Sequence, residues 1–211
     1  MINWAIFASG NGSNAEAIIQ KFEKRVCSTE IKLVLCNKAD AYILERVKKY
    51  PEIKAVVFDK KDLYERETIR DLLRDNDIYC IALAGFNWIL PENIVNVMPK
   101  KRILNLHPSL LPKYGGKGMY GNKVHEAVLL NKEKQSGITI HYVNEKYDEG
   151  EIIEQIKCEV LENDTVETLS TRIHALEHEH YPRIIDERSE TLAMNSIFSN
   201  VDSFDFYHRF K

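Results

Sequence analysis

The chain has 211 residues, enough for one sizeable hydrophobic core and few for two, so we expect a single domain over residues 1–188 with a C-terminal extension at 189–211 that is not a separate domain. Hydrophobic residues at 44% and charged residues at 29% are ordinary globular values, which argues against a disordered chain or a disulfide scaffold. The net charge of -3 supplies no excess positive charge for nucleic-acid binding.

The first half of the chain alternates apolar runs of strand length with helical patterns. Residues 2–8 form a β-leaning run that stops at a glycine-rich turn at 9–14, and apolar side chains then recur on one helical face up to residue 22. Further strands are expected at 31–36, 54–58, 78–84 and 102–106, and helices at 42–49, 63–74 and 91–97. This alternation predicts an α/β fold with a parallel sheet, helices on both faces and ligands beyond the carboxyl ends of its strands.

After residue 109 the pattern changes. A loop, a helix and two strands are expected at 108–122, 122–131, 136–144 and 151–160, respectively. Asp164 and Glu167 resemble a capping box that begins a helix running to about residue 187. The residues beyond it are polar and aromatic with weak periodicity, so we expect the extension to lie on the surface or on a partner.

The glycine turn has the features of a phosphate site. Gly12, Ser13 and Asn14 stand at the start of a helix that follows a strand, where backbone N–H groups and the helix dipole attract anions. The segment lacks the Gly-Lys-Ser/Thr ending of a P-loop, and Ala15 occupies the place of the last glycine of a dinucleotide fingerprint. A single phosphate group therefore fits better than NAD, and a turn with a helix N-cap but no ligand is the alternative.

Asn105 and His107 alternate within an expected strand, so their side chains share one face. They would point together beyond the strand's carboxyl end, although both could instead satisfy nearby backbone groups. Asp148 lies at an expected turn, where an Asp is ordinarily explained by turn chemistry. If it lay within about 4 to 6 Å of His107, its charge would raise the pKa of the imidazole and make it an acid usable near neutrality.

Three histidines and a glutamate crowd the expected C-terminal helix: His174, Glu177, His178 and His180. The pair His174 and His178 has an i, i+4 spacing that metals use, but the stretch is not H-E-x-x-H and spacing identifies no further ligand. A solvated helix face with one substrate contact is the favoured interpretation, and no metal is expected.

The four cysteines are scattered without a C-x-x-C pair, which argues against a structural zinc site and a disulfide framework. No apolar run approaches the roughly 20 residues of a membrane span, and no leader with a cleavage site opens the sequence. A reducing cytoplasm is therefore the expected location.

Together these motifs resemble the phosphoribosylglycinamide formyltransferase family of purine synthesis. The matching stretches follow the family's order over most of residues 1–185: Ser9-Gly-Asn-Gly-Ser-Asn14, Asn37-Lys-Ala-Asp40, Leu83-Ala-Gly-Phe86, Ile89-Leu90, Asn105-Leu-His-Pro-Ser-Leu-Leu-Pro-Lys-Tyr114, Asp148-Glu-Gly150, Glu177-His178 and Tyr181-Pro182. The Asn-x-His-Pro-Ser core is shared with related folate enzymes, whereas the glycine turn and the Lys-Tyr pair favour the glycinamide branch. The resemblance implies a mostly parallel, Rossmann-like sheet in one domain.

The resemblance also implies two small-molecule partners and the residues that bind them. Glycinamide ribonucleotide would be bound by Gly12, Ser13, Asn14, His174 and Glu177. The co-substrate 10-formyltetrahydrofolate would be bound by Lys61, Asn87, Trp88, Ile89, Leu90, Asn144, Glu145, Lys146 and Tyr147. Neither nucleic acid nor a membrane is implied, and the protein would be a monomer or a homodimer.

For catalysis the resemblance implies Asn105, His107 and Asp148. The substrate amine attacks the formyl carbon, negative charge develops on the formyl oxygen, and the folate nitrogen leaves as an amine. Asn105 and protonated His107 would stabilise that oxygen, His107 would act as general acid, and Asp148 would raise the pKa of His107. No metal is needed, because the formyl group is already activated on the folate.

The chain departs from the family pattern in three respects. Trp88 and Lys61 stand at or near positions where arginines are expected, His174 replaces a glutamine, and the loop at 115–122 is longer than usual, with glycines suited to a lid. None of these departures falls on the three catalytic positions.

Three other functions share the same features. A 10-formyltetrahydrofolate hydrolase has the Asn-x-His and Asp core but usually carries an N-terminal regulatory domain. Methionyl-tRNA formyltransferase adds a C-terminal RNA-binding domain, for which residues 189–211 are too few. A catalytically silent folate or nucleotide sensor is the third alternative, since a fold alone does not give function.

Overall fold

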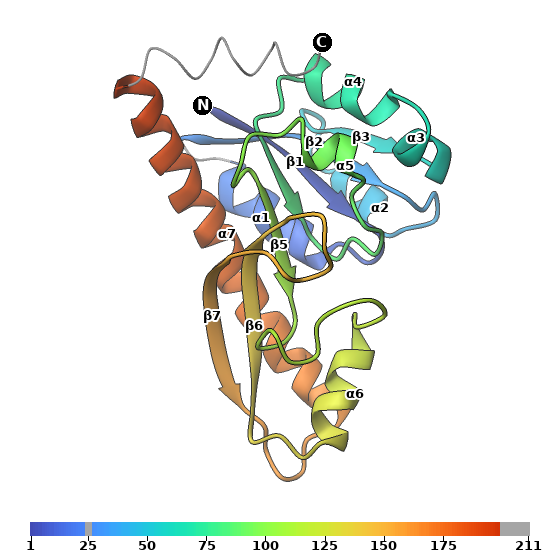
Figure 1. Cartoon of the computed structure of the whole chain (residues 1–211), viewed down its shortest axis with the longest axis vertical. Helices are drawn as coiled ribbons and strands as arrows, with labels where there is room; N and C mark the ends of the chain where they lie inside the picture. Colours follow the sequence, from blue (N-terminus) through green and yellow to red (C-terminus); the bar gives the residue numbers. More distant parts are fainter. Residues whose placement is uncertain (24–26, 199–211) are drawn as a thin grey trace.

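The computed structural model describes residues 1–23 and 27–198, and within them seven strands form one sheet in the order β3-β2-β1-β4-β5-β6-β7 (Figure 1). The strands are β1 (Ile2–Ala8), β2 (Thr29–Cys36), β3 (Lys54–Val57), β4 (Cys80–Leu83), β5 (Ile103–His107), β6 (Gln135–Tyr142) and β7 (Ile152–Glu159). β1 to β5 pair in parallel, whereas β6 and β7 pair antiparallel. The predicted α/β fold with a mostly parallel sheet is confirmed.

Helices cover both faces of the sheet, as predicted. The helices of the described residues are α1 (Ser13–Phe22), α2 (Ile43–Val47), α3 (Lys60–Tyr64), α4 (Thr68–Asp75), α5 (Glu92–Val95), α6 (Asn122–Leu130) and α7 (Val166–Phe198). Ile6 of β1 packs in a core cluster with residues of α1 and α7, and its neighbour Phe7 packs in a second cluster with residues of α3, α4 and α5. Burial on both faces explains why every residue of β1 except Asn3 is apolar, with no alternation.

The direction in which strands are added reverses at β1. β2 and β3 lie on one side of it, and β4 and β5 lie on the other. Ligands of open parallel sheets bind beyond the carboxyl ends of the strands at such a reversal. The glycine turn follows β1, residues 87–90 follow β4, and His107 ends β5, so three of the predicted site segments are placed at this edge.

The prediction that the last helix ends near residue 187 is wrong, because α7 continues to Phe198. Ser189 is fully buried, and its Oγ accepts a hydrogen bond of 2.9 Å from Trp4 Nε1. Leu192 joins the core cluster beside α1. A buried serine counts as polar in a hydropathy pattern, which concealed the buried face. Residues 199–211, the rest of the expected extension, lie outside the described residues.

Two local predictions also differ from the structure. Thr165 and Thr168, rather than Asp164 and Glu167, exchange the reciprocal side-chain to backbone hydrogen bonds at the start of α7. The helix expected at 63–74 is divided into α3 and α4. No helix of the described residues is long and apolar enough to cross a membrane.

Candidate active site

A cavity of about 580 Å³ lies at the ends of β4 and β5, with walls from the loops after them, the β6–β7 loop, α6 and α7. Its lining includes most of the predicted site residues: Asn14, Asn87, Trp88, Ile89, Leu90, Asn105, His107, Asn144, Lys146, Tyr147, Asp148, His174 and Glu177. Gly12, Ser13, Lys61 and Glu145 are not part of that lining. The fold thus brings together segments that are far apart in the sequence.

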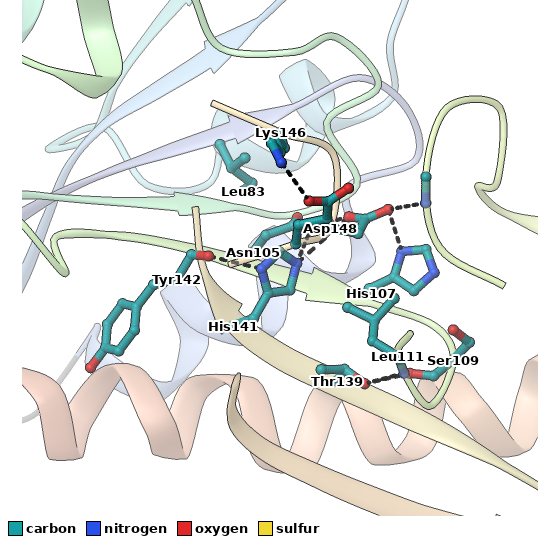
Figure 2. A network of polar contacts seen from close by, with 12 residues as sticks. Leu83, Asn105, His107, Ser109, Leu111, Thr139, His141, Tyr142, Lys146 and Asp148 are labelled. Atoms are coloured by element: carbon teal, nitrogen blue, oxygen red, sulfur yellow. Dashed lines mark hydrogen bonds and ion pairs between the residues drawn. The ribbon is translucent and has the colours of Figure 1, made fainter. Parts of the chain in front are cut away.

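The Asp148 carboxylate lies between the Asn105 and His107 side chains (Figure 2). Asn105 Nδ2 donates to Asp148 Oδ1 at 3.3 Å, and His107 Nδ1 lies 3.5 Å from Asp148 Oδ2. The shared face of Asn105 and His107 is therefore confirmed, and Asp148 comes close enough to act on the imidazole.

Both ring nitrogens of His107 face acceptors. Nε2 donates to the Tyr114 carbonyl at 2.7 Å, while Nδ1 faces the Asp148 carboxylate. The doubly protonated imidazolium is therefore the form that satisfies both contacts. Burial opposes that form and holds the pKa of His107 below its ordinary value, outweighing the raising effects of Asp148 and the Tyr114 carbonyl. Asp148 thus acts on the pKa of His107 in the predicted direction, but the net pKa is lowered rather than raised. Desolvation of the nearly enclosed ring is the larger effect.

Left-handed backbone holds both partners of His107 in place. Asp148 has φ 54° and Tyr114 has φ 58°, a region that non-glycine residues rarely adopt. The Gly116 N–H donates to Asp148 Oδ2 at 2.9 Å. Although burial raises the pKa of Asp148, contacts with His141, His107 and this N–H lower it overall, so the carboxylate is ionised. Such strained residues cluster at functional sites.

His141 is a member of this network that the sequence did not identify. It pairs with Asn105 across β5 and β6, and its Nε2 lies 3.1 Å from Asn105 Nδ2. Its Nδ1 donates to the Tyr142 carbonyl at 2.9 Å, so in the neutral ring Nε2 accepts from Asn105, and the same Nε2 lies 3.6 Å from Asp148 Oδ1. Alternation within residues 136–144 indicated a strand there, but only the register of the sheet places His141 beside Asn105.

The predicted ribonucleotide residues occupy one part of the cavity and its rim. Asn14 Nδ2 donates to Glu177 Oε2 at 2.8 Å, and His174 Nε2 lies 3.9 Å from the same oxygen. Glu177 is buried, and burial raises the pKa of its carboxyl. Gly12 has φ 77° at the N-cap of α1, and a Cβ there would overlap the Ile43 side chain, so glycine is required.

The predicted folate stretch lines the cavity around an aromatic cluster. The Trp88 ring packs edge-on against Phe58 at 6.0 Å between centroids, and Lys60 Nζ lies 5.7 Å from the Trp88 ring centre. Lys61 belongs to the same helix, α3, but is exposed and outside the lining. Lys60 is therefore the lysine of α3 that reaches Trp88, which the sequence did not distinguish from its neighbour.

Further histidines lie on α6 and α7. His125 of α6 is buried in the cavity lining, and burial lowers its pKa to about 4; no sequence pattern singled it out. The rings of His174 and His178 stack with centroids 6.2 Å apart on α7. Among residues 1–23 and 27–198, no three His, Cys, Asp or Glu side chains gather in a group that could hold a metal ion.

Comparison with known proteins identifies close relatives of this fold and site. The family described as formyl transferase matches residues 2–185. Phosphoribosylglycinamide formyltransferase of Bacillus subtilis (strain 168) is 37% identical over 191 residues, covering 89% of this chain and 94% of that protein. The chloroplastic phosphoribosylglycinamide formyltransferase of Arabidopsis thaliana is 39% identical over 86% of this chain, which spans only 63% of that relative's length.

A solved structure agrees with the sequence relatives. The crystal structure of phosphoribosylglycinamide formyltransferase from Anaplasma phagocytophilum superposes with a TM-score of 0.82 at 36% identity, covering 90% of this chain and 87% of that one. Fold and sequence therefore agree, and the chain belongs to the formyl transferase family, among the phosphoribosylglycinamide formyltransferases.

Proposed function

We propose that the protein transfers the formyl group of 10-formyltetrahydrofolate to the amine of glycinamide ribonucleotide. The observation that carries this proposal is the ionised Asp148 held between Asn105 and His107 in a cavity that also reaches Asn14, Glu177 and residues 87–90. A ribonucleotide and a folate bound in this one cavity would have the amine and the formyl group next to each other, as transfer between them requires.

The chemistry assigns a role to each catalytic side chain. The ribonucleotide amine attacks the formyl carbon, the C=O electron pair moves onto the formyl oxygen, and hydrogen-bond donors must stabilise that charge. Asn105 Nδ2 is one such donor, and His107 Nδ1–H is the other once the formyl oxygen displaces its 3.5 Å contact with Asp148. Collapse of the intermediate breaks the bond to the folate nitrogen, which takes a proton from His107. The attacking nitrogen then gives its extra proton to the neutral His107, which restores the imidazolium.

The hydrogen bonds of Asn105 constrain this mechanism. Its two amide hydrogens point to His141 Nε2 at 3.1 Å and to Asp148 Oδ1 at 3.3 Å. The contact with Asp148 is the longer one and is the one that the formyl oxygen would replace. Asp148 supports the charged form of His107 against the opposing effect of burial, so its role is to offset desolvation rather than to give His107 a raised pKa.

An absorbance assay for loss of formyl from 10-formyltetrahydrofolate tests the proposal, with and without glycinamide ribonucleotide. We expect turnover that requires the ribonucleotide and falls about 10²- to 10³-fold in His107→Ala. His180→Ala is the matched control, because His180 lies on α7 outside the cavity lining. Deformylation that ignores the ribonucleotide would indicate a hydrolase, and binding without turnover would indicate a sensor.

We also infer that this reaction takes place in a reducing cytoplasm, in a monomer or homodimer. The four cysteines are all free in the structure, and Cys36 and Cys80 are buried. Thermal unfolding with and without a reductant checks the first point, since a protein without disulfides should unfold at the same temperature in both. Light scattering measures the assembly.

A further inference from the structure

The glycine turn is fixed from two sides by charged residues of different helices. On one side Glu177 of α7 accepts from Asn14. On the other side Arg46 of α2 bonds to Asn11, and the Ile43 N–H donates to the Gly10 carbonyl at 3.2 Å. Two independent supports on one short turn indicate that its conformation is specified by the tertiary structure.

Arg46 binds the turn with its whole guanidinium. Nε donates to the Asn11 carbonyl at 2.9 Å, and Nη2 donates to Asn11 Oδ1 at 2.7 Å. Nη1 pairs with Glu16 of α1, and the guanidinium lies over the Tyr42 ring at 4.9 Å. The Arg46 side chain is only 19% exposed, and its contact with Glu16 is partly buried, whereas the bonds to Asn11 lie at the surface.

The turn needs such a support because it leaves the start of α1 open. Gly12 is in the left-handed conformation, and no side chain caps the helix. The first backbone N–H groups of a helix are then free to bind an anion, provided that the preceding residues keep their orientation. A planar guanidinium that holds two oxygens of Asn11 supplies that orientation, which a single-point contact cannot.

Glu16 introduces a charge problem that Arg46 also addresses. Glu16 lies in the first turn of α1, where a carboxylate would repel an incoming phosphate dianion. Burial opposes its ionisation, yet Lys49 and Arg46 lower its pKa, so it is charged and paired. The ion pair therefore both anchors the guanidinium and neutralises the carboxylate.

We propose that Arg46 is a positioning residue for the ribonucleotide, holding Asn11 so that the turn presents its backbone N–H groups to the phosphate. This inference rests on the proposed function. Arg46 itself need not touch the substrate, since each of its three guanidinium nitrogens already contacts Asn11 or Glu16.

The test compares Arg46→Met with Lys48→Met, an exposed residue at the end of α2 that pairs with Glu45. For Arg46→Met we expect KM for the ribonucleotide to rise about 10- to 100-fold, the loss associated with charged hydrogen bonds, with kcat and KM for the folate within about twofold. For Lys48→Met all three should stay at wild-type values. Equal increases in both KM values, or a loss of kcat alone, would overturn the proposal.

Two further variants separate positioning from charge. Arg46→Lys keeps a positive charge beside Glu16 but lacks the fork that holds both Asn11 oxygens, so KM for the ribonucleotide should stay raised. In Arg46→Met combined with Glu16→Gln, the carboxylate that Arg46 neutralised is removed as well, leaving only the exposed Lys49 without its partner, and KM should again stay raised. Recovery of wild-type KM in either variant would show that only charge matters. Formyl loss from the wild type that ignores the ribonucleotide would instead overturn the proposed function, and Arg46's role with it.

Discussion

His141 Nε2 lies 3.1 Å from the amide nitrogen of Asn105, across the antiparallel pair of β5 and β6. In the neutral ring His141 Nδ1 donates to the Tyr142 carbonyl and Nε2 accepts from Asn105, which fixes the orientation of that amide. The proposed oxyanion donor is thus oriented by a residue that itself need not touch the formyl group.

Replacing His141 should therefore weaken catalysis without weakening binding. We expect kcat of His141→Ala to fall about 2- to 10-fold, the effect of losing one hydrogen bond, with KM for both substrates near wild type. His141→Gln retains a carbonyl acceptor and should lose less. Steady-state kinetics measure both variants, and equal kcat in His141→Ala and wild type would contradict the role of His141.

Asp148→Asn removes the charge that offsets desolvation of His107. We expect turnover to fall at least about 10²-fold and the pKa of His107 to move further below its ordinary value, since burial then acts with less opposition. An NMR titration of the His107 ring reports the pKa. Glu151→Gln, an exposed carboxylate on the same connection, is the control; an unchanged His107 pKa in Asp148→Asn would count against the pairing.

Stability should decline below neutral pH because of His125. Its pKa in the folded protein is about 4, so the folded chain keeps it neutral while the unfolded chain takes up a proton below about pH 6.5. The free energy of unfolding should accordingly fall as pH drops from 6.5 to 4, by on the order of 2 kcal/mol after allowing for solvent screening.

Urea unfolding of wild type and His125→Gln at pH 7.5 and at pH 5 measures this difference. The glutamine variant cannot take up the proton, so its free energy of unfolding should change less between the two pH values. Parallel pH dependence in the two proteins would exclude His125 as the source.

The extended α7 predicts a stability effect far from the active site. Ser189→Ala leaves the buried Trp4 Nε1–H without its acceptor, which should lower the free energy of unfolding by about 1 to 3 kcal/mol while turnover is retained. Thr191→Ala changes an exposed hydroxyl two positions further along the same helix and should change stability far less. Equal stability of the two variants would argue that the C-terminal part of α7 contributes little.

Much of the fold could be predicted from local pattern. Apolar runs alternating with helical segments determined a parallel sheet with two covered faces, because buried strands and amphipathic helices have different periods. The strand period also placed Asn105 and His107 on one face. The local pattern placed the end of α7 too early. Ser189 is polar by residue type, but its hydroxyl is buried and makes its hydrogen bonds inside the core.

The tertiary structure alone decided how the site is assembled. Asp148 reaches Asn105 and His107 through a left-handed loop, and His141 reaches Asn105 through strand register, neither of which spacing along the chain can specify. The net direction of the His107 pKa depends on how far water is excluded from the ring, a property of packing. Most of the residues predicted from the sequence line one cavity, whereas His141, His125 and the support from Arg46 were found only through long-range contacts.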